Sequence, residues 1–214
     1  MPQIKLTNNK TIYCWKITET ISELRGLVRL SEEELRIFHS FRKDKRKLEI
    51  LASRALLQSI IPESHIKYVN KNPTLEGSDE EISISHSGEK VLIQLKEKDE
   101  LVGVDIQMIS EQTIRIKHKF LHESEQILIE KHKKDNLLLT NLFWSAKESV
   151  FKAFASISTS EEVIEFKTQI IFEAINFRTK KITGSFIESD NTVNFEIGLY
   201  VEDEFVVTWF DKVS

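Results

Sequence analysis

The chain has 214 residues, of which 40% are hydrophobic and 30% charged, and its formal net charge is −4. These values are typical of a soluble globular protein with one large or two small domains, and the acidic balance argues against a chain built as a whole to bind nucleic acid. No apolar run approaches the roughly 18 residues of a membrane span, and the single cysteine excludes an internal disulfide and a multi-cysteine metal site.

The first segments of the chain predict a cytoplasmic protein that begins with a strand. Residues 1–6 lack the long apolar core of a secretory signal. Residues 10–18 alternate between apolar and polar positions, as a strand does. Cys14 lies within this segment among apolar neighbours, so we expect a buried strand thiol rather than a reactive one.

A helical segment follows. Ser31 and the three glutamates after it predict a helix N-cap with an acidic first turn. The helical pattern of apolar residues continues to Ile60, and Pro62 ends it. We expect either one bent helix or two helices broken near Ser40.

Short β-prone segments come next, at 66–70, 81–86, 90–96 and 101–106. Gly, Pro, Asn and Asp residues between them predict turns at Asn72-Pro73, 76–79, Ser87-Gly88 and Lys98-Asp99. A helical region then covers about 111–156, with breaks near His122 and Asp135. Further β-prone segments lie at 163–172, 182–188, 193–200 and 204–210. The order predicts an α+β fold that could consist of two similar halves.

A basic segment, residues 42–47, stands out from the acidic chain because five of its six residues are Lys or Arg. Such a segment is often the solvated face of a helix. It could also dock an acidic protein or the phosphates of a ligand. Nucleic-acid binding is less well supported, since no aromatic residues alternate with the basic ones.

Two segments carry residues suited to phosphate chemistry. In Trp144–Lys152, helical spacing places Trp144, Glu148 and Lys152 on one face. In Gly103–Gln107, Asp105 is expected to leave the end of a strand. Two carboxylates and a lysine suit a divalent cation that holds a polyphosphate. Asp105 could instead cap a turn, and Glu148 could instead pair with Lys152 along the helix.

These segments, in their order along the chain, resemble the 4′-phosphopantetheinyl transferases of the larger, monomeric class. The matching segments are Ile84–Gly88, Gly103–Gln107, Phe120–Glu125 and Trp144–Lys152, and the matched region begins near Arg54. The resemblance implies two similar α+β halves in a pseudo-twofold arrangement. Residues 1–100 would form the side that binds the 3′-phosphate of coenzyme A, and residues 101–214 the side that binds metal and pyrophosphate. The active site would lie in the cleft between them.

The reaction that the resemblance implies moves the 4′-phosphopantetheine moiety of coenzyme A to a serine of an acyl or peptidyl carrier protein, and it releases adenosine 3′,5′-bisphosphate. It implies Mg²⁺, or Mn²⁺ in its place, and a monomer that binds neither nucleic acid nor membrane. The implied catalytic residues are Asp105, Glu148 and Lys152. The implied metal ligands are Asp105, Gln107 and Glu148. The residues implied to bind coenzyme A are Arg54, Ser85, His86, Lys147 and Lys152, with Lys147 serving either coenzyme A or the carrier. Glu148 is also a candidate general base.

The sequence departs from the family pattern in three places. Gln107 stands where the family often has glutamate, Asn72 stands where it has lysine, and residues 154–158 lack the glycines that usually follow the last motif. The first two departures support an alternative, a catalytically weak homologue that still binds carrier protein or coenzyme A. A nucleic-acid-binding module that uses residues 42–47 is a third hypothesis.

Overall fold

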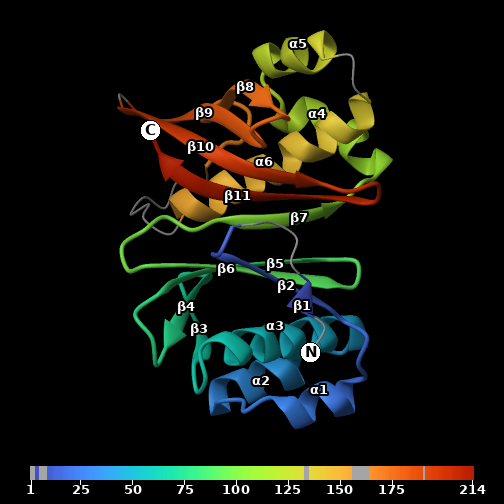
Figure 1. Ribbon diagram of the computed structural model, residues 1–214, viewed down its shortest axis with the longest axis vertical. Helices are drawn as coiled ribbons and strands as arrows, with labels where there is room; N and C mark the ends of the chain where they lie inside the picture. Colours follow the sequence, from blue (N-terminus) through green and yellow to red (C-terminus); the bar gives the residue numbers. More distant parts are fainter. Residues whose placement is uncertain (1–2, 5–8, 133–134, 156–163, 190) are drawn as a thin grey trace. The chain divides into compact units, whose positions relative to one another are not determined.

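The computed structural model describes residues 3–4, 9–132, 135–155, 164–189 and 191–214. The chain divides into two compact units, Met1–Glu100 and Leu101–Ser214. Each unit combines helices with an antiparallel sheet and has its own buried core (Figure 1). The roles assigned to the two halves, and a cleft between them, stay predictions.

The N-terminal unit is a sheet covered by helices. Its elements are β1 (Gln3–Ile4), β2 (Ile12–Lys16), α1 (Ile21–Leu27), α2 (Glu32–Ser40), α3 (Asp44–Ile60), β3 (His65–Val69), β4 (Asn72–Glu76), β5 (Glu81–Ser87) and β6 (Lys90–Lys96). The main sheet has the order β1-β2-β6-β5, and the β3–β4 hairpin contacts it through β4 and β5. Helix α3 packs on β2 and β6.

The C-terminal unit has a sheet with the order β7-β11-β10-β9-β8. Its elements are β7 (Val104–Met108), α4 (Glu111–Phe120), α5 (Glu123–Lys131), α6 (Asn136–Ala155), β8 (Ile170–Asn176), β9 (Lys181–Glu188), β10 (Asn191–Val201) and β11 (Phe205–Val213). The long helix α6 packs on β7 and β11.

The two units share one order of elements, although β3 and β4 form a separate two-stranded sheet in the N-terminal unit. Apart from β1, each described unit runs as one strand, three helices and four strands. In each, the long third helix packs on the first and last strands, which lie side by side. The predicted α+β fold with two similar halves is therefore confirmed. The pseudo-twofold relation between the halves stays a prediction.

Three helices begin where side chains satisfy the first backbone N–H groups. Thr20 with Glu23, Ser31 with Glu34, and His122 with Glu125 each form a reciprocal capping box at the starts of α1, α2 and α5. The predicted cap at Ser31 is thus confirmed. The segment that follows is two helices, α2 and α3, with the break after Ser40.

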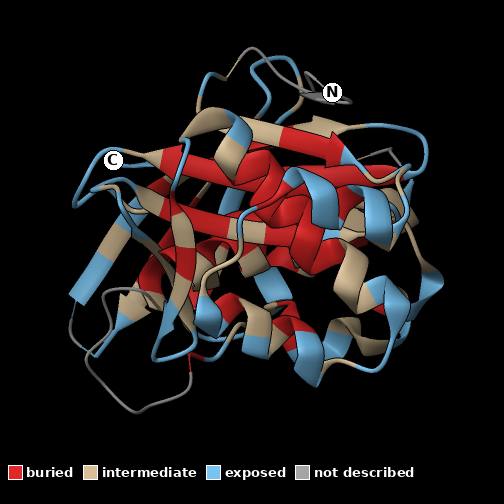
Figure 2. Ribbon diagram, turned by 90° about the horizontal axis from the view of Figure 1, so that it is seen from below, coloured by how far each residue is buried: buried red, intermediate tan, exposed pale blue. Residues whose placement is uncertain are grey.

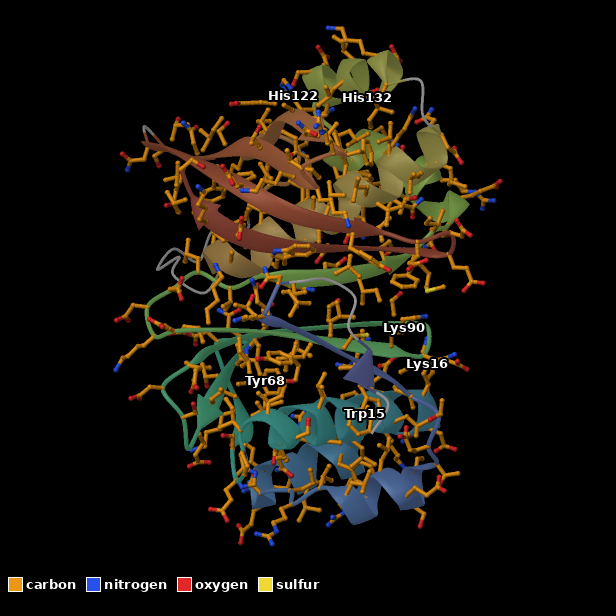
Figure 3. All side chains as sticks on the ribbon, viewed as in Figure 1. Trp15, Lys16, Tyr68, Lys90, His122 and His132 are labelled. Carbon is orange, nitrogen blue, oxygen red and sulfur yellow. The ribbon has the colours of Figure 1, made fainter. Side chains whose placement is uncertain are left out.

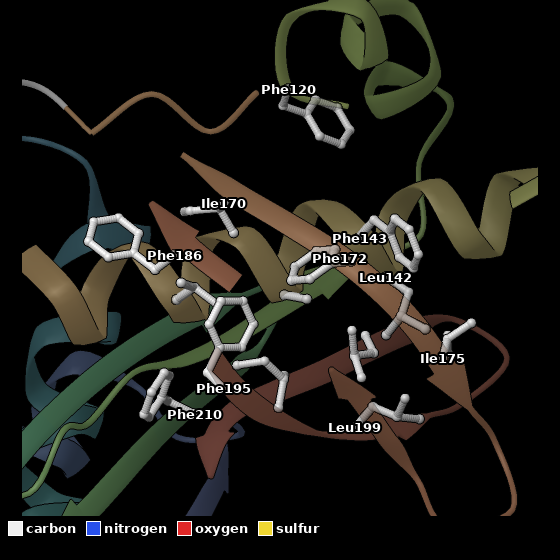
Figure 4. Close-up of a cluster of buried hydrophobic side chains, with 14 of the residues drawn as sticks. Phe120, Leu142, Phe143, Ile170, Phe172, Ile175, Phe186, Phe195, Leu199 and Phe210 are labelled. Atoms are coloured by element: carbon white, nitrogen blue, oxygen red, sulfur yellow. The ribbon is translucent and has the colours of Figure 1, made fainter. Parts of the chain in front are cut away.

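Each core lies between a sheet and its helices, and the buried residues gather there (Figure 2). The N-terminal core includes Trp15, which lies between β2 and the helices (Figure 3). The C-terminal core is rich in phenylalanine (Figure 4), and the rings of Phe154 and Phe186 stack with centroids 4.1 Å apart. Such aromatic burial is a major source of stability for an interior of this size.

Cys14 is buried in β2, as predicted. Burial raises the pKa of its thiol to about 12, and the nearby charge of Lys90 offsets only part of that effect. Among the described residues, no helix combines the length and the apolar character needed to span a membrane.

The predicted turn at Asn72-Pro73 is wrong. Asn72 pairs with Val69 across the β3–β4 hairpin, so Asn72 and Pro73 are the first residues of β4. The turn is formed by Asn70 and Lys71, whose φ angles are 50° and 70°. A two-residue hairpin loop with positive φ at both positions matches the right-handed twist of the strands, and asparagine tolerates this conformation well.

Two strand boundaries also differ from the prediction. β7 begins only at Val104, so Asp105 is its second residue rather than a residue at its end. β8 begins only at Ile170, and residues 164–169 precede it without strand structure. The predicted helix end at residue 156, the predicted strand start at 163 and most of the glycine-free segment 154–158 lie outside the described residues.

Candidate active site

A glycine lets β7 approach α6 closely. A Cβ atom on Gly103 would lie 1.9 Å from the backbone oxygen of Ser149 and 2.9 Å from the backbone nitrogen of Ala153. Any side chain here would therefore push the strand away from the helix. The close approach places Asp105 of β7 beside the part of α6 that carries Lys152.

Lys152 ties the helix to the strand. Its ammonium donates hydrogen bonds to Oδ1 of Asp105 and to the backbone oxygen of Val104, each at 2.9 Å. Asp105 is buried, whereas Lys152 is partly exposed. The ammonium of Lys152 is thus a partly exposed cation that contacts a buried carboxylate.

Glu148 lies one helical turn before Lys152. Burial raises the pKa of the Glu148 carboxyl, and the negative charge of Asp105 raises it further, while Lys152 acts in the opposite direction. The structure therefore brings Asp105, Glu148 and Lys152 together, with two acidic groups for one lysine.

The chemistry of this donor set fits a magnesium ion. Mg²⁺ prefers carboxylate oxygens and commonly takes only one or two from the protein, with water and substrate phosphates as its other ligands. Within the described part of the chain, no group of three or more His, Cys, Asp or Glu side chains could hold a metal. Gln107 donates from Nε2 to the backbone oxygen of Met108 at 2.7 Å, so its carbonyl oxygen is the group it could offer to a cation.

Lys147 lies in the interior of the C-terminal unit. It is fully buried, and its Nζ atom lies 2.8 Å from Oε2 of Glu125. The same ammonium donates to the backbone oxygens of Phe166 and Ile170 at 2.6 and 2.7 Å. With its hydrogens directed at these acceptors, Lys147 supports the interior of this unit. A contact with coenzyme A or a carrier stays a prediction. Burial lowers the pKa of Lys147 to about 8, although Glu125 acts to raise it.

His86 lies on β5, on the face that packs toward α3. Its Nδ1 atom is 3.4 Å from Oε2 of Glu49, and its Nε2 atom contacts Nη1 of Arg46. Neighbouring residues of a strand point to opposite faces, so Ser85 faces away from His86. The two residues implied to bind coenzyme A therefore lie on opposite faces of β5, and Arg46 from the basic segment contacts His86.

Arg54 is also a structural residue. It is 2% exposed, and its Nε atom donates to Oε1 of Glu34 at 3.1 Å. Its Nη1 atom donates to the hydroxyl of Ser53 at 3.0 Å. Nη2 of this enclosed guanidinium has no hydrogen-bond partner among the described residues. The predicted contact of Arg54 with a phosphate stays a prediction.

The two units build their interiors around the same kind of network. Glu34 and Glu125 are each the N3 residue of a capping box, and both are fully buried. Glu34 binds Arg54 of α3 and accepts the backbone N–H of Ile66 in β3. Glu125 binds Lys147 of α6 and accepts the backbone N–H of Phe172 in β8.

The sequence does not predict these two networks, and it does not single out Glu49 as a partner of Arg46 and His86. The capping pattern at Ser31 and Glu34 was a signal for the first of them, because a capping glutamate lies close to the chain that enters the helix. Nothing local to Glu49 distinguishes it from other helix acids.

Comparisons with known proteins agree on one family. The family model described as the 4′-phosphopantetheinyl transferase superfamily matches residues 101–209, about half of the chain. The chain is 36% identical over 112 residues to the 4′-phosphopantetheinyl transferase gsp of Aneurinibacillus migulanus. That match covers 49% of this chain and 45% of the relative, so the chain is matched to less than half of that protein.

Proposed function

The chain belongs to the 4′-phosphopantetheinyl transferase superfamily, and from this membership we propose that it transfers the 4′-phosphopantetheine moiety of coenzyme A to a serine of an acyl or peptidyl carrier protein. The observation that carries the proposal is the meeting of Asp105, Glu148 and Lys152, joined by the 2.9 Å contact between Lys152 and Asp105. The carrier protein, the release of adenosine 3′,5′-bisphosphate, a cytoplasmic location and a monomeric state belong to the same proposal.

The reaction is attack by the serine hydroxyl on the phosphorus that carries the pantetheine arm. A bond from the serine oxygen to this phosphorus forms, and the bond from the phosphorus to the oxygen of the leaving adenosine bisphosphate breaks. Charge grows on the phosphate oxygens, so catalysis depends mainly on cations and on positioning. Asp105 and Glu148 would hold Mg²⁺, or Mn²⁺ in its place, with Gln107 as a neutral third candidate. When bound, the ion supplies positive charge to the pyrophosphate.

Lys152 supplies the chain's own positive charge. As a compact ammonium on a flexible stem, it can turn from Asp105 toward a phosphate oxygen with little cost. Glu148 is also the candidate that takes the serine proton, directly or through a water molecule.

The N-terminal unit would hold the other end of coenzyme A. Arg46 and His86 contact one another in this unit through Nη1 and Nε2, and both residues would donate to a phosphate with a proton on Nε2. Two such donors suit a phosphate monoester, here the 3′-phosphate. Ser85 could contribute from the other face of β5. Arg54 and Lys147 stay candidates for this site only if a ligand reaches their buried groups, which are paired with Glu34 and Glu125.

The test is a transfer assay with the full chain. The protein is incubated with coenzyme A, MgCl₂ and an apo carrier protein, and the carrier is weighed by intact-mass spectrometry. We expect a gain of one phosphopantetheine moiety, which is lost with Glu148→Ala and with a chelator. No gain with carriers of fatty-acid, polyketide and peptide synthesis would contradict the proposal.

A second candidate function is supported by Gln107, which leaves the site one carboxylate fewer than in relatives with glutamate at this position. The chain would then bind coenzyme A or a carrier without efficient transfer. Binding of coenzyme A without any gain in carrier mass is the result that favours this candidate. If Gln107→Glu then restores transfer, the missing carboxylate is the cause.

A further inference from the structure

A buried glutamate lies behind the two exposed donors of the N-terminal unit. Oε2 of Glu49 is 3.1 Å from Nη1 of Arg46 and 3.4 Å from Nδ1 of His86, while Oε1 is 4.0 Å from Lys45. The Glu49 side chain is 7% exposed, whereas those of Arg46 and His86 are 37% and 36% exposed. Oε2 of Glu49 thus lies near both Arg46 and His86, on the side of these residues that faces the core.

The arrangement joins a helix to a strand far away in the sequence. Arg46 and Glu49 lie on the first turns of α3, and His86 lies near the end of β5. The Arg46 guanidinium also lies over the ring of Phe41, 5.4 Å from its centroid. Arg46 is therefore restrained by a carboxylate, an imidazole and an aromatic ring, and each restraint lowers the entropy it loses on binding a ligand.

Burying a carboxylate costs free energy, so a buried glutamate needs hydrogen bonds or ion pairs that offset this cost. Glu49 follows Leu48 and precedes two core residues, Ile50 and Leu51, in a helix whose interior face is apolar. Its partners are the basic residues and the histidine described above. The carboxylate therefore organises these donors at the edge of the core.

We propose that Glu49 is a positioning residue that holds Arg46 and His86 together as one receptor for a phosphate monoester, and so makes the chain select coenzyme A that carries its 3′-phosphate. This inference rests on the proposed function. Oε2 of Glu49 lies 3.4 Å from Nδ1 of the imidazole, and the other ring nitrogen, Nε2, contacts Arg46. A phosphate bound there would take hydrogen bonds from both residues in place of their mutual contact, with a proton on Nε2.

The negative charge of Glu49 also repels a phosphate. Glu49 therefore strengthens phosphate binding only if its ordering of the donors outweighs this repulsion. The carboxylate lies behind the Arg46 guanidinium and the His86 imidazole and within 4.0 Å of Lys45, and these groups separate it from the surface. Ordering two donors for a charge-assisted pair outweighs this screened repulsion. Removal of Glu49 should therefore weaken phosphate binding.

The experiment measures binding by calorimetry for the full chain with coenzyme A and with 3′-dephospho-coenzyme A. We expect Glu49→Ala to weaken coenzyme A binding roughly tenfold, as for the loss of one hydrogen bond to a charged group, with no change for the dephosphorylated compound. Glu49→Gln keeps an acceptor oxygen and should recover part of the affinity. In the transfer assay, KM for coenzyme A should rise while kcat at saturation stays the same. Glu33→Ala, an exposed acid on α2, is the matched control.

Three results for Glu49→Ala overturn the inference. They are equally weakened binding of both compounds, which indicates a general structural defect, tighter binding of coenzyme A, which makes Glu49 a competitor of the phosphate, and unchanged binding. A wild-type chain that does not bind coenzyme A overturns it as well. The last result also removes the proposed function. A chain that binds coenzyme A but modifies no carrier contradicts the proposed function alone, because the comparison of the two compounds still tests Glu49.

Discussion

Two lysines of helix α6 have opposite environments. Lys147 is enclosed with Glu125, while Lys152 is partly exposed and contacts Asp105. Positions five residues apart on a helix differ by about 140° in direction. We therefore expect Lys147 to determine the stability of the C-terminal unit and Lys152 to determine its chemistry.

The change Lys147→Met should destabilise the C-terminal unit by about 3–5 kcal/mol, because it leaves the buried Glu125 carboxylate without its cation. Urea unfolding followed by the fluorescence of the C-terminal tryptophans measures the loss. The double change Glu125→Gln with Lys147→Met is the control, since it removes the charge as well. If the double variant is no more stable than the single one, the charge pair is not the cause.

The change Lys152→Met should leave the fold intact and lower kcat/KM for transfer roughly 100-fold, the scale of one lost charged contact to a ligand. Circular dichroism checks the fold, and the carrier mass assay measures the rate. Lys152→Arg keeps the charge but not the compact ammonium, so we expect only partial activity. Full activity in Lys152→Met would show that the pyrophosphate does not need this lysine.

At the scale of the elements, Gly103 controls the distance between β7 and α6. The change Gly103→Ala forces its Cβ against the backbone of Ser149, so the strand must move and carry Asp105 with it. We expect a loss of about 3 kcal/mol of stability and a loss of transfer activity. Thermal unfolding and the mass assay measure the two effects.

Gly26 supplies the matched control for that prediction. A Cβ atom on Gly26 meets nothing within 4 Å, and the residue lies in α1. Gly26→Ala should therefore be neutral or stabilising by up to about 1 kcal/mol, since alanine loses less entropy in a helix. A similar destabilisation by both substitutions would show that the close contact at Gly103 is not the reason.

The sequence predicted the elements that depend on local chemistry. The cap at Ser31, the break near Ser40 and the breaks near His122 and Asp135 all follow from side chains close to the affected backbone. Helix α1 was missed because it is short and has a single buried residue, Leu24.

The parts of the site that depend on long-range packing could not be predicted. The helical spacing of Glu148 and Lys152 indicates their common face, and the family motifs lead to Asp105. Nothing in the spacing reveals that Lys147 pairs with Glu125, 22 positions earlier, or that His86 meets Glu49. Whether a basic residue is buried depends on which distant carboxylate the fold brings to it.

At the scale of the whole molecule, the response to acid should begin in the N-terminal unit. Burial acts to raise the pKa of Glu34, but hydrogen bonds from the backbone of Ile66 and Ser31, the charge of Arg54 and the bond to His65 outweigh it and lower the pKa below its usual 4.5. A carboxyl with a lower pKa in the folded chain adds stability above its unfolded pKa and loses it as pH falls through the folded value.

The difference in stability between the wild type and Glu34→Gln should therefore be largest near neutral pH and should shrink as pH falls below about 4.5. Hydrogen exchange read peptide by peptide assigns the effect to residues 1–100. A difference that stays constant down to about pH 3 would mean that hydrogen bonding, not charge, makes Glu34 important.

The equivalent networks of the two units also allow their residues to be matched one to one. If Arg54 corresponds to Lys147, then Ala55 corresponds to Glu148 and Ser59 to Lys152. A duplicated ancestral half would thus have kept its internal scaffold in both copies and its reactive side chains in only one. The expected stoichiometry is one coenzyme A and one turnover centre per chain, so titration to saturation should end at a molar ratio of one.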